Sequence, residues 1–256
     1  MKCKPPTHHL RQRQRGVALF VVIVLVMLSM LLALWASRTS LFNEMLVGND
    51  ADYQRAFEAA QALLQDAELD IRSEKADGTR CTGSGDICRT STADKIPLEA
   101  QDVTPLLTAL GNQTPQCRNG LCAKRTGKQD FWNNTDESKG PTLAQMTAET
   151  VGARYGRFTG AAIGSTDAPA NPILAATDAN RGGWYWIEVL PYDESSKNSG
   201  LIVGSTSNLL GLDLTPSVVY RITALAHGHK PSTMVVLQQT YAQQKFDESK
   251  KKKKKK

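Results

Sequence analysis

The sequence predicts an α+β protein in which one long N-terminal helix packs on a C-terminal antiparallel sheet. Three observations predict this architecture. Residues 17–36 form an apolar run of twenty residues without a charge. Apolar residues then recur at three- and four-residue steps as far as Ile71, which is the period of an amphipathic helix. Stretches rich in β-branched and aromatic residues follow in the C-terminal part and are typical of strands.

The apolar run is predicted to cross a membrane once. At about 1.5 Å per residue, a helix of this length matches the roughly 30 Å hydrocarbon core of a bilayer. Five basic residues precede the run, and only Arg38 follows it closely. This excess of positive charge predicts a cytoplasmic N-terminus and an exported C-terminal part. The five residues are Lys2, Lys4, Arg11, Arg13 and Arg15.

The junction between the basic segment and the apolar run predicts how the chain is processed. A secretory signal has an apolar core of about 7 to 15 residues followed by a small-residue cleavage site. Here the run is longer, and residues 35–39 contain no such site. The small-residue junction lies before the run, at Gly16. A cut after Gly16 would leave the helix on the mature protein, with Val17 as its N-terminus.

Further stretches at both ends of the chain bear on the class of this protein: Gln14–Leu19, Arg38–Leu41, Gly48–Asn49, Ala56–Ala60, Val219–Ala224 and Val235–Tyr241. The junction at Gly16 resembles the class III leader of type IV pilins and pseudopilins, and these stretches narrow the resemblance to the PilX-type minor pilins. The resemblance implies a type IV pilin-like fold, cleavage by a prepilin peptidase between Gly16 and Val17, and N-methylation of Val17.

Two positions depart from the pattern of major pilins. Val17 stands where they usually have Phe, and Val21 stands where they usually have Glu. In the family at large, that carboxylate is thought to neutralise an N-terminal amine buried in the filament core, where an unpaired charge is expensive. The absence of the carboxylate suits a rare subunit at a special position, such as the tip.

The resemblance implies a minor pilin that takes part in priming type IV pilus assembly and sits in or at the tip of a fibre used for twitching motility and adhesion. It implies an inner-membrane protein with a periplasmic C-terminal domain that later joins the fibre. Its implied partners are other minor pilins, the major pilin, the prepilin peptidase, the inner-membrane assembly platform and, before assembly, the lipid bilayer. Two alternatives remain: a type II secretion pseudopilin, and a membrane-anchored periplasmic adhesion or ligand-binding domain that keeps its leader.

The chain divides by composition into six predicted segments. They are a leader (1–16), a membrane-spanning half-helix (17–36), an amphipathic half-helix (37–74), a loop-rich disulfide region (75–150), the sheet domain (151–246) and a disordered lysine-rich tail (247–256).

Gly48 and Asn49 are a predicted weak point of the long helix, since glycine costs about 1 kcal/mol relative to alanine inside a helix.

Shorter elements are predicted within the second half of the chain. Two short helices are expected around residues 98–110 and 141–149. The predicted strands cover residues 153–158, 184–190, 217–226 and 233–241, with a further short strand at Gly200–Gly204.

The cysteines predict disulfides rather than a metal site. Cys3 lies in the leader, which leaves an even number of cysteines in an exported domain. Four cysteines permit three connectivities. We favour Cys81 with Cys88 and Cys117 with Cys122, because both intervals are short and contain flexible residues. A four-thiolate zinc site is the alternative, although neither interval is a C-x2-C knuckle.

The net charge of the chain comes from its two ends. The formal charge is +6, but without the leader and the lysines of 250–256 the remaining residues number 19 basic and 25 acidic, a charge of −6. Nucleic-acid binding by a basic surface is therefore not supported. The lysines themselves could attract phosphates or anionic headgroups, but a solvated tail or an artificial addition explains them better.

No catalytic constellation, cofactor motif or metal site is predicted. His227 and His229 lie in a predicted hairpin loop, where a polar turn explains them better than a metal site or a catalytic triad. Alternation along a strand places Trp184 and Trp186 on one face and Tyr185 on the other. Packing of these aromatic residues in the core, against the long helix, explains them better than a ligand-stacking surface. The acidic residues of 66–70 are expected to be solvated on the helix surface rather than to hold a metal.

Overall fold

The computed structural model describes residues 15–82, 87–89, 91, 94–125, 130–161, 171–178, 180–191 and 218–242. The chain forms two compact units, Met1–Ala51 and Asp52–Lys256. The predicted strand at Gly200–Gly204 and the lysine-rich tail lie outside the described residues.

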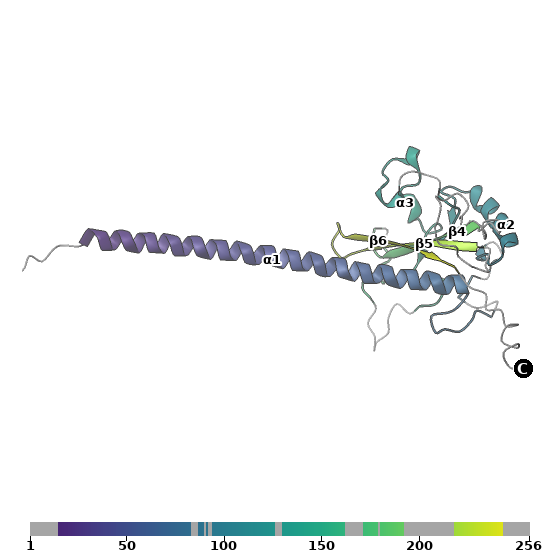
Figure 1. Ribbon diagram of the computed structural model, residues 1–256, viewed down its shortest axis with the longest axis horizontal. Helices are drawn as coiled ribbons and strands as arrows, with labels where there is room; N and C mark the ends of the chain where they lie inside the picture. The colour runs from purple at the N-terminus through teal and green to yellow at the C-terminus, as the bar shows by residue number, and fades with distance from the viewer. Residues whose placement is uncertain are drawn as a thin grey trace, which may run out of the picture. The chain divides into compact units, whose positions relative to one another are not determined.

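The long helix α1 spans Arg15–Arg72 without a break (Figure 1). The helix continues through Gly48 and Asn49, the predicted weak point. The cost of one glycine, about 1 kcal/mol, does not break a helix whose neighbouring residues favour it. In the first unit the large apolar side chains between Val17 and Val47 are 39–71% exposed. Among the described residues, α1 is the one helix long and apolar enough to cross a membrane. It therefore fits a single-pass membrane anchor.

The end of α1 is determined by a turn in the backbone. Ser73 adopts a positive φ of 53°, which stops the helical path. The N–H of Glu74 donates to the carbonyl of Leu69 at 2.9 Å, and the N–H of Ser73 donates to the carbonyl of Asp70 at 3.1 Å. This pattern is a Schellman motif, which satisfies carbonyls that the helix leaves unpaired.

The second unit contains a six-stranded sheet. Its strand order is β1-β2-β4-β5-β6, and β3 pairs with β4 beside this path. The strands are β1 (Cys117–Arg118), β2 (Leu121–Cys122), β3 (Ala153–Arg154), β4 (Gly183–Pro191), β5 (Val218–His227) and β6 (Met234–Tyr241).

The sheet is mixed, which corrects the expectation of an antiparallel sheet. The pairs β4–β5 and β5–β6 are antiparallel, but β2 runs parallel to β4 with Leu121 opposite Ile187. A parallel pair needs a long crossover, and here the chain between β2 and β4 supplies one. Neither β1 nor β2 was predicted, because a strand of two residues is too short to show a period in the sequence.

The shorter elements agree in part with their predictions. Helix α2 (Ala100–Gly111) confirms the first predicted short helix, whereas α3 (Leu143–Met146) is a single turn inside the second. Two 3-10 turns, η2 (Phe131–Asn133) and η3 (Glu137–Lys139), precede α3. The predicted strand at 153–158 is reduced to β3, because Gly156 turns the chain with a φ of +71°.

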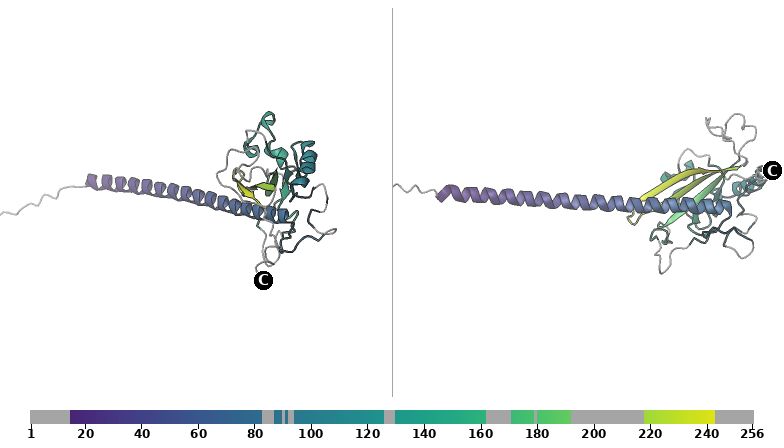
Figure 2. Two further views of the ribbon diagram at one scale, coloured as in Figure 1. Left: turned by 45° about the vertical axis from the view of Figure 1, so that its right-hand side comes forward. Right: turned by 60° about the horizontal axis from the view of Figure 1, so that its bottom comes forward.

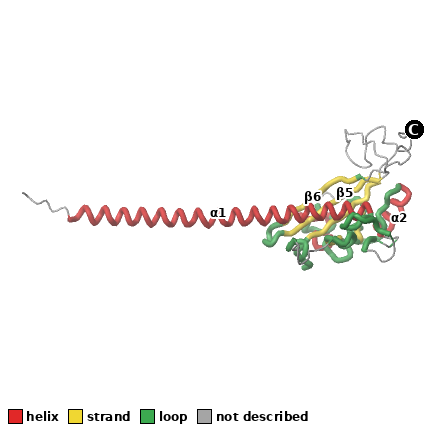
Figure 3. Tube along the Cα trace, turned by 90° about the horizontal axis from the view of Figure 1, so that it is seen from below, coloured by secondary structure: helices red, strands yellow, loops and turns green. Residues whose placement is uncertain are grey.

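The C-terminal part of α1 lies along one face of this sheet in all views (Figures 1 and 2), and Figure 3 shows it crossing in front of the strands. The apolar core between helix and sheet contains Tyr185, Ile187 and Val189 of β4. A second core covers the opposite face. It contains the two tryptophans of β4 together with Cys117, Cys122, Phe131, Met146, Val151 and Leu225.

These two cores correct the expected placement of the aromatic residues. Trp184, Tyr185 and Trp186 are all buried in the core, as expected. Only Tyr185 packs with residues of the long helix, whereas Trp184 and Trp186 pack on the face away from it. The prediction that Trp184 and Trp186 share one face of the strand and Tyr185 lies on the other is confirmed. The alternation of residues along a strand does not indicate which of the two faces the helix covers.

Candidate functional site

The candidate site is a row of three buried carboxylates on α1, where the helix meets the sheet domain. Asp52, Asp66 and Asp70 are 2%, 2% and 4% exposed. The expectation that the acidic residues of 66–70 are solvated is therefore wrong for Asp66 and Asp70. Steps of 14 and 4 residues return to nearly the same side of an α-helix, so the three carboxylates lie on one face.

Small residues on the same face explain why carboxylates can reach the domain. Four alanines on this part of the helix are fully buried: Ala56, Ala59 and Ala60, between Asp52 and Asp66, and Ala67, between Asp66 and Asp70. Alanine side chains allow the backbone of α1 to lie close to the sheet. The loops beside the sheet then come within hydrogen-bond distance of the three aspartates.

Asp52 binds the loop between β5 and β6. Its two oxygens accept the backbone N–H groups of His229 at 2.8 Å and Lys230 at 3.1 Å. Burial acts to raise the pKa of Asp52, but hydrogen bonds from the Thr233 side chain and from these N–H groups lower the pKa below its ordinary value. The carboxylate is therefore well suited to hold this loop as an anion.

Asp66 binds the turn that follows β3. One oxygen accepts the N–H of Gly156 at 2.7 Å, and the other accepts the hydroxyl of Thr159. Burial raises the pKa of Asp66 to about 6, although both hydrogen bonds oppose the rise, and the charge of Asp70 adds to it. Desolvation is thus stronger here than at Asp52.

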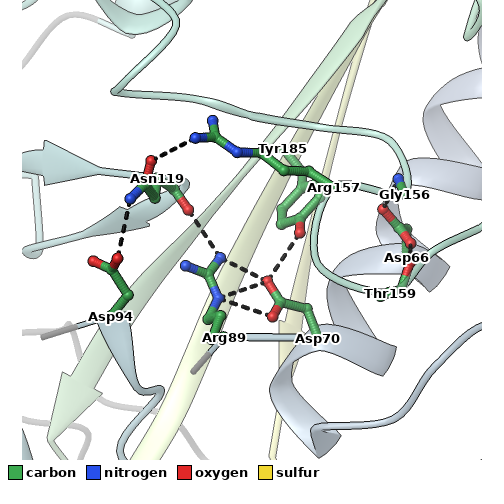
Figure 4. A network of polar contacts seen from close by, with 9 residues as sticks. All are labelled: Asp66, Asp70, Arg89, Asp94, Asn119, Gly156, Arg157, Thr159 and Tyr185. Carbon is green, nitrogen blue, oxygen red and sulfur yellow. Dashed lines mark hydrogen bonds and ion pairs between the residues drawn. The ribbon is translucent and has the colours of Figure 1, made fainter. Parts of the chain in front are cut away.

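Asp70 forms an ion pair with Arg89 (Figure 4). The Nε and Nη2 atoms of Arg89 donate to both carboxylate oxygens, the shortest contact being 2.6 Å. Tyr185 of β4 donates its hydroxyl to Asp70 at 2.9 Å. A carboxylate in the last turn of a helix opposes the helix dipole. The positive charge of the Arg89 guanidinium compensates for this unfavourable interaction. Burial raises the pKa of Tyr185, so its hydroxyl keeps the proton that it donates to Asp70.

Arg89 also connects Asp70 to the turn between β1 and β2. Its Nη2 donates to the carbonyl of Asn119 at 2.8 Å, and its guanidinium lies 3.7 Å from the centre of the Phe158 ring. The Asn119 side chain in turn donates to Asp94 and accepts from Arg157 (Figure 4). Three separate loops are thus joined to the end of α1 by one polar network.

A fourth buried carboxylate lies on the opposite face of the sheet. Glu188 of β4 is bound by Arg125 at 2.9 Å and by Arg221 of β5, which lies directly opposite in the register. Burial acts to raise the pKa of Glu188, but the two arginines lower it below its ordinary value.

A cleft of about 640 Å³ lies between the turn that precedes β3 and the loop that precedes β4. Arg154 forms part of its wall and lies over the ring of Trp184 at 3.7 Å. The guanidinium already donates to the carbonyls of four loop residues, Ala176, Thr177, Asp178 and Arg181. Arg154 therefore holds this loop in place.

The structure joins Cys81 to Cys88 and Cys117 to Cys122, the pairing favoured from the sequence. None of these four residues is then a thiolate that could bind zinc. Cys117 and Cys122 are buried in the second core, whereas Cys81 is only half-buried.

The remaining predicted residues have clear positions. Gly16 and Val17 lie in the first turn of α1. His227 belongs to β5 rather than to the loop, and its ring meets Trp184 edge-on at 5.8 Å. The backbone of His229 binds Asp52. Within the described ranges, no group of three or more His, Cys, Asp or Glu side chains is placed to hold a metal ion.

A single apolar helix that continues as the spine of an α+β domain is the layout of a pilin. Two family models match the chain: "PilX N-terminal" over residues 15–65 and "Type IV pilus assembly protein PilX C-term" over residues 118–243. Together they cover more than two thirds of the chain, which belongs to the PilX family of type IV pilus minor pilins. This family is a structural component of pili. Comparisons with curated proteins and with solved structures give no significant match.

Proposed function

We propose that this minor pilin helps to prime type IV pilus assembly and occupies a position at or near the tip of the fibre. The observation that carries the proposal is the apolar run Val17–Ala36, which contains no acidic residue and has Val21 at its fifth position. Its side chains are exposed along the helix and available to lipid or to other helices.

The physics of polymerisation supports a special position. Subunits that associate head to tail through a contact that does not close form a helical filament. Each helix then exchanges lipid contacts for helix contacts. A subunit with Val21 has no carboxylate to neutralise the N-terminal amine of a neighbour, and an unpaired charge is expensive in an apolar core. Fewer neighbours need such compensation at the tip than within the shaft.

The docking of α1 supports a role in which helix and domain act together. Asp52, Asp66 and Asp70 tie the C-terminal part of the helix to three different loops. A force on this part of the helix is therefore transmitted to the sheet domain. Other minor pilins, the major pilin and the inner-membrane assembly platform are the proposed partners, and the domain is proposed to lie in the periplasm before assembly.

Deletion of the chain tests the priming role. We expect the number of surface pili to fall strongly and to be restored by the wild-type chain. A chain with Val21→Glu should be processed normally and recovered from sheared fibres along the shaft as well as at the tip, as seen by immunogold labelling. Unchanged pilus numbers after deletion would contradict the proposed priming role. Label for the wild-type chain spread evenly along the shaft would contradict the proposed tip position.

Mass spectrometry of the mature chain tests the processing step. We expect a chain that begins with N-methylated Val17. A Gly16→Leu variant should retain Met1 and fail to enter fibres, while a Gly48→Leu variant, which changes a glycine inside the same helix, should be processed as the wild type is. A wild-type chain that retains Met1 would contradict the proposal.

A further inference from the structure

Arg89 occupies an unusual position for a charged residue. It directly follows Cys88, and its side chain is only 4% exposed. A buried guanidinium is stable only where anions and acceptors replace water around it. Asp70 and the carbonyl of Asn119 supply these contacts. The Nη1 atom, however, is buried and has no hydrogen-bond partner within the part of the chain that the structure describes.

Hydrogen bonds to Asp70 and Asn119 hold the guanidinium of Arg89, and they are not its only restraint. The backbone next to Arg89 is covalently tied, because Cys88 forms a disulfide with Cys81. Cys81 is anchored in turn to the end of α1, since its N–H donates to the carbonyl of Ser73 at 3.0 Å. The disulfide thus closes a short loop whose two ends lie at the end of α1 and at Arg89.

The two disulfides differ in their access to solvent. Cys117 and Cys122 lie among the aromatic residues of the second core. Cys88 is buried, at 8% exposure, but Cys81 is only half-buried, so a sulfur of this disulfide lies nearer to solvent. Thiol–disulfide exchange requires the attacking thiolate to reach a sulfur atom, so the more exposed disulfide exchanges first.

We propose that the Cys81–Cys88 disulfide is a redox-sensitive latch that holds Arg89 on Asp70 and so keeps the end of α1 docked on the domain. A dithiol opens the latch in two steps. Its first thiolate attacks one sulfur of the disulfide, which breaks the Cys81–Cys88 bond, forms a mixed disulfide and releases the other cysteine as a thiolate. Its second thiolate then displaces the remaining cysteine thiolate, so that Cys81 and Cys88 become thiols and the dithiol becomes a cyclic disulfide.

Opening the latch removes the constraint that places Arg89. Asp70 then loses the cation that neutralises it, and a buried carboxylate without its partner is unfavourable. The last turns of α1, from Asp66 to Arg72, loosen as a result. A chain that has not yet been oxidised would have the same loosened end, so full docking of the helix follows disulfide formation. This inference does not depend on where the subunit sits in the fibre.

The test uses the full-length protein in detergent. The protein is incubated with increasing dithiothreitol, free thiols are alkylated, and mass spectrometry identifies which disulfide has opened. Hydrogen exchange of the peptide that covers 66–72 is measured on the same samples. We expect Cys81–Cys88 to open at a dithiothreitol concentration about ten times lower than Cys117–Cys122, and exchange in 66–72 to rise in step with its opening.

Variants separate a latch from a general loss of stability. In Arg89→Met, exchange of 66–72 should already be fast in the oxidised protein, and opening the disulfide should add little. Arg72→Met changes a half-buried arginine in the last turn of α1 that does not bind Asp70, and it should keep the wild-type response. The double variant Cys81→Ala, Cys88→Ala should show fast exchange without dithiothreitol, which tests the latch even if Arg89→Met does not fold. Slow exchange after Cys81–Cys88 opens, or an equal response in Arg89→Met and wild type, would overturn the proposal.

Discussion

The backbone N–H of Gly156 donates a 2.7 Å hydrogen bond to the carboxylate of Asp66, across 90 residues of sequence. Thr159 of the same turn donates its hydroxyl to the second oxygen. These two donors replace water around a carboxylate that α1 buries against the domain. The helix is therefore attached by specific polar contacts as well as by apolar packing, and those contacts select one register along the sheet.

Asp66 should make stability depend on pH. Its pKa in the folded protein is about 6, above its ordinary value of 3.8, so the folded protein binds the proton more tightly. The free energy of unfolding therefore falls as the pH rises through this window and stays lower above it. The difference between the two pKa values corresponds to about 3 kcal/mol.

Asp66→Asn should remove this pH dependence, because the amide carries no charge at any pH. Urea unfolding of the full-length protein in detergent between pH 4 and pH 8 measures it. Glu58→Gln, an exposed residue of the same helix, is the control and should follow the wild-type curve. Parallel curves for Asp66→Asn and wild type would contradict the assignment.

Glu188 should make stability depend on pH in the opposite direction to Asp66. Its folded-state pKa lies below its ordinary value of 4.5, so it stabilises the protein above that pH and loses this effect as the pH falls through the folded-state pKa. Glu188→Gln should lower the free energy of unfolding by about 1–3 kcal/mol at pH 7, because Arg125 and Arg221 lose their common anion. The free energy of unfolding lost in Glu188→Gln should be smaller at acid pH, where Glu188 of the wild type is protonated. Glu74→Gln, which affects a more exposed pair with Arg72, should cost less than about 1 kcal/mol. A loss for Glu188→Gln that is the same at pH 3 and pH 7 would refute the role of its charge.

Gly228→Ala should weaken the attachment of the β5–β6 loop. A Cβ atom there would lie 2.4 Å from the Asp52 carboxylate and 2.7 Å from Thr233. Because hydrogen bonds hold that carboxylate in place, the clash should cost about 1–3 kcal/mol. Gly111→Ala is the matched control, since its Cβ would meet nothing within 4 Å. Chemical unfolding of both variants measures the difference, and equal stabilities would show that the loop adjusts freely.

Arg154→Lys should loosen the loop that precedes β4. Lysine keeps the charge but cannot lie flat on Trp184 while donating to four carbonyls. We expect faster proteolysis within residues 176–182 and a change in tryptophan fluorescence. Arg181→Lys alters an exposed arginine of the same loop and should change neither signal. If Arg154→Lys is cut no faster than the wild type, the hydrogen bonds of Arg154 do not hold the loop.

Most of the fold could be predicted, but much of the candidate site could not. The period of apolar residues identified α1, and β-branched and aromatic residues identified β4, β5 and β6. The short strands β1 and β2 were missed because two residues carry no period. Asp66 and Asp70 were assigned to solvent from their residue type, although they continue the three- and four-residue steps of Ala59, Leu63 and Ala67. That spacing is the signal that could have found them.

The membrane segment, the long helix, the pairing of cysteines along short intervals and the family resemblance follow from the order of residues alone, because each depends on neighbours a few positions apart. The tertiary structure decided which face of the sheet the helix covers, that β2 runs parallel to β4, and that the aspartates are buried. It also brought Arg89 to Asp70 across 19 residues and Gly156 to Asp66 across 90. Such contacts arise only when α1 lies on the sheet, since desolvation and hydrogen bonding depend on what surrounds a side chain in space.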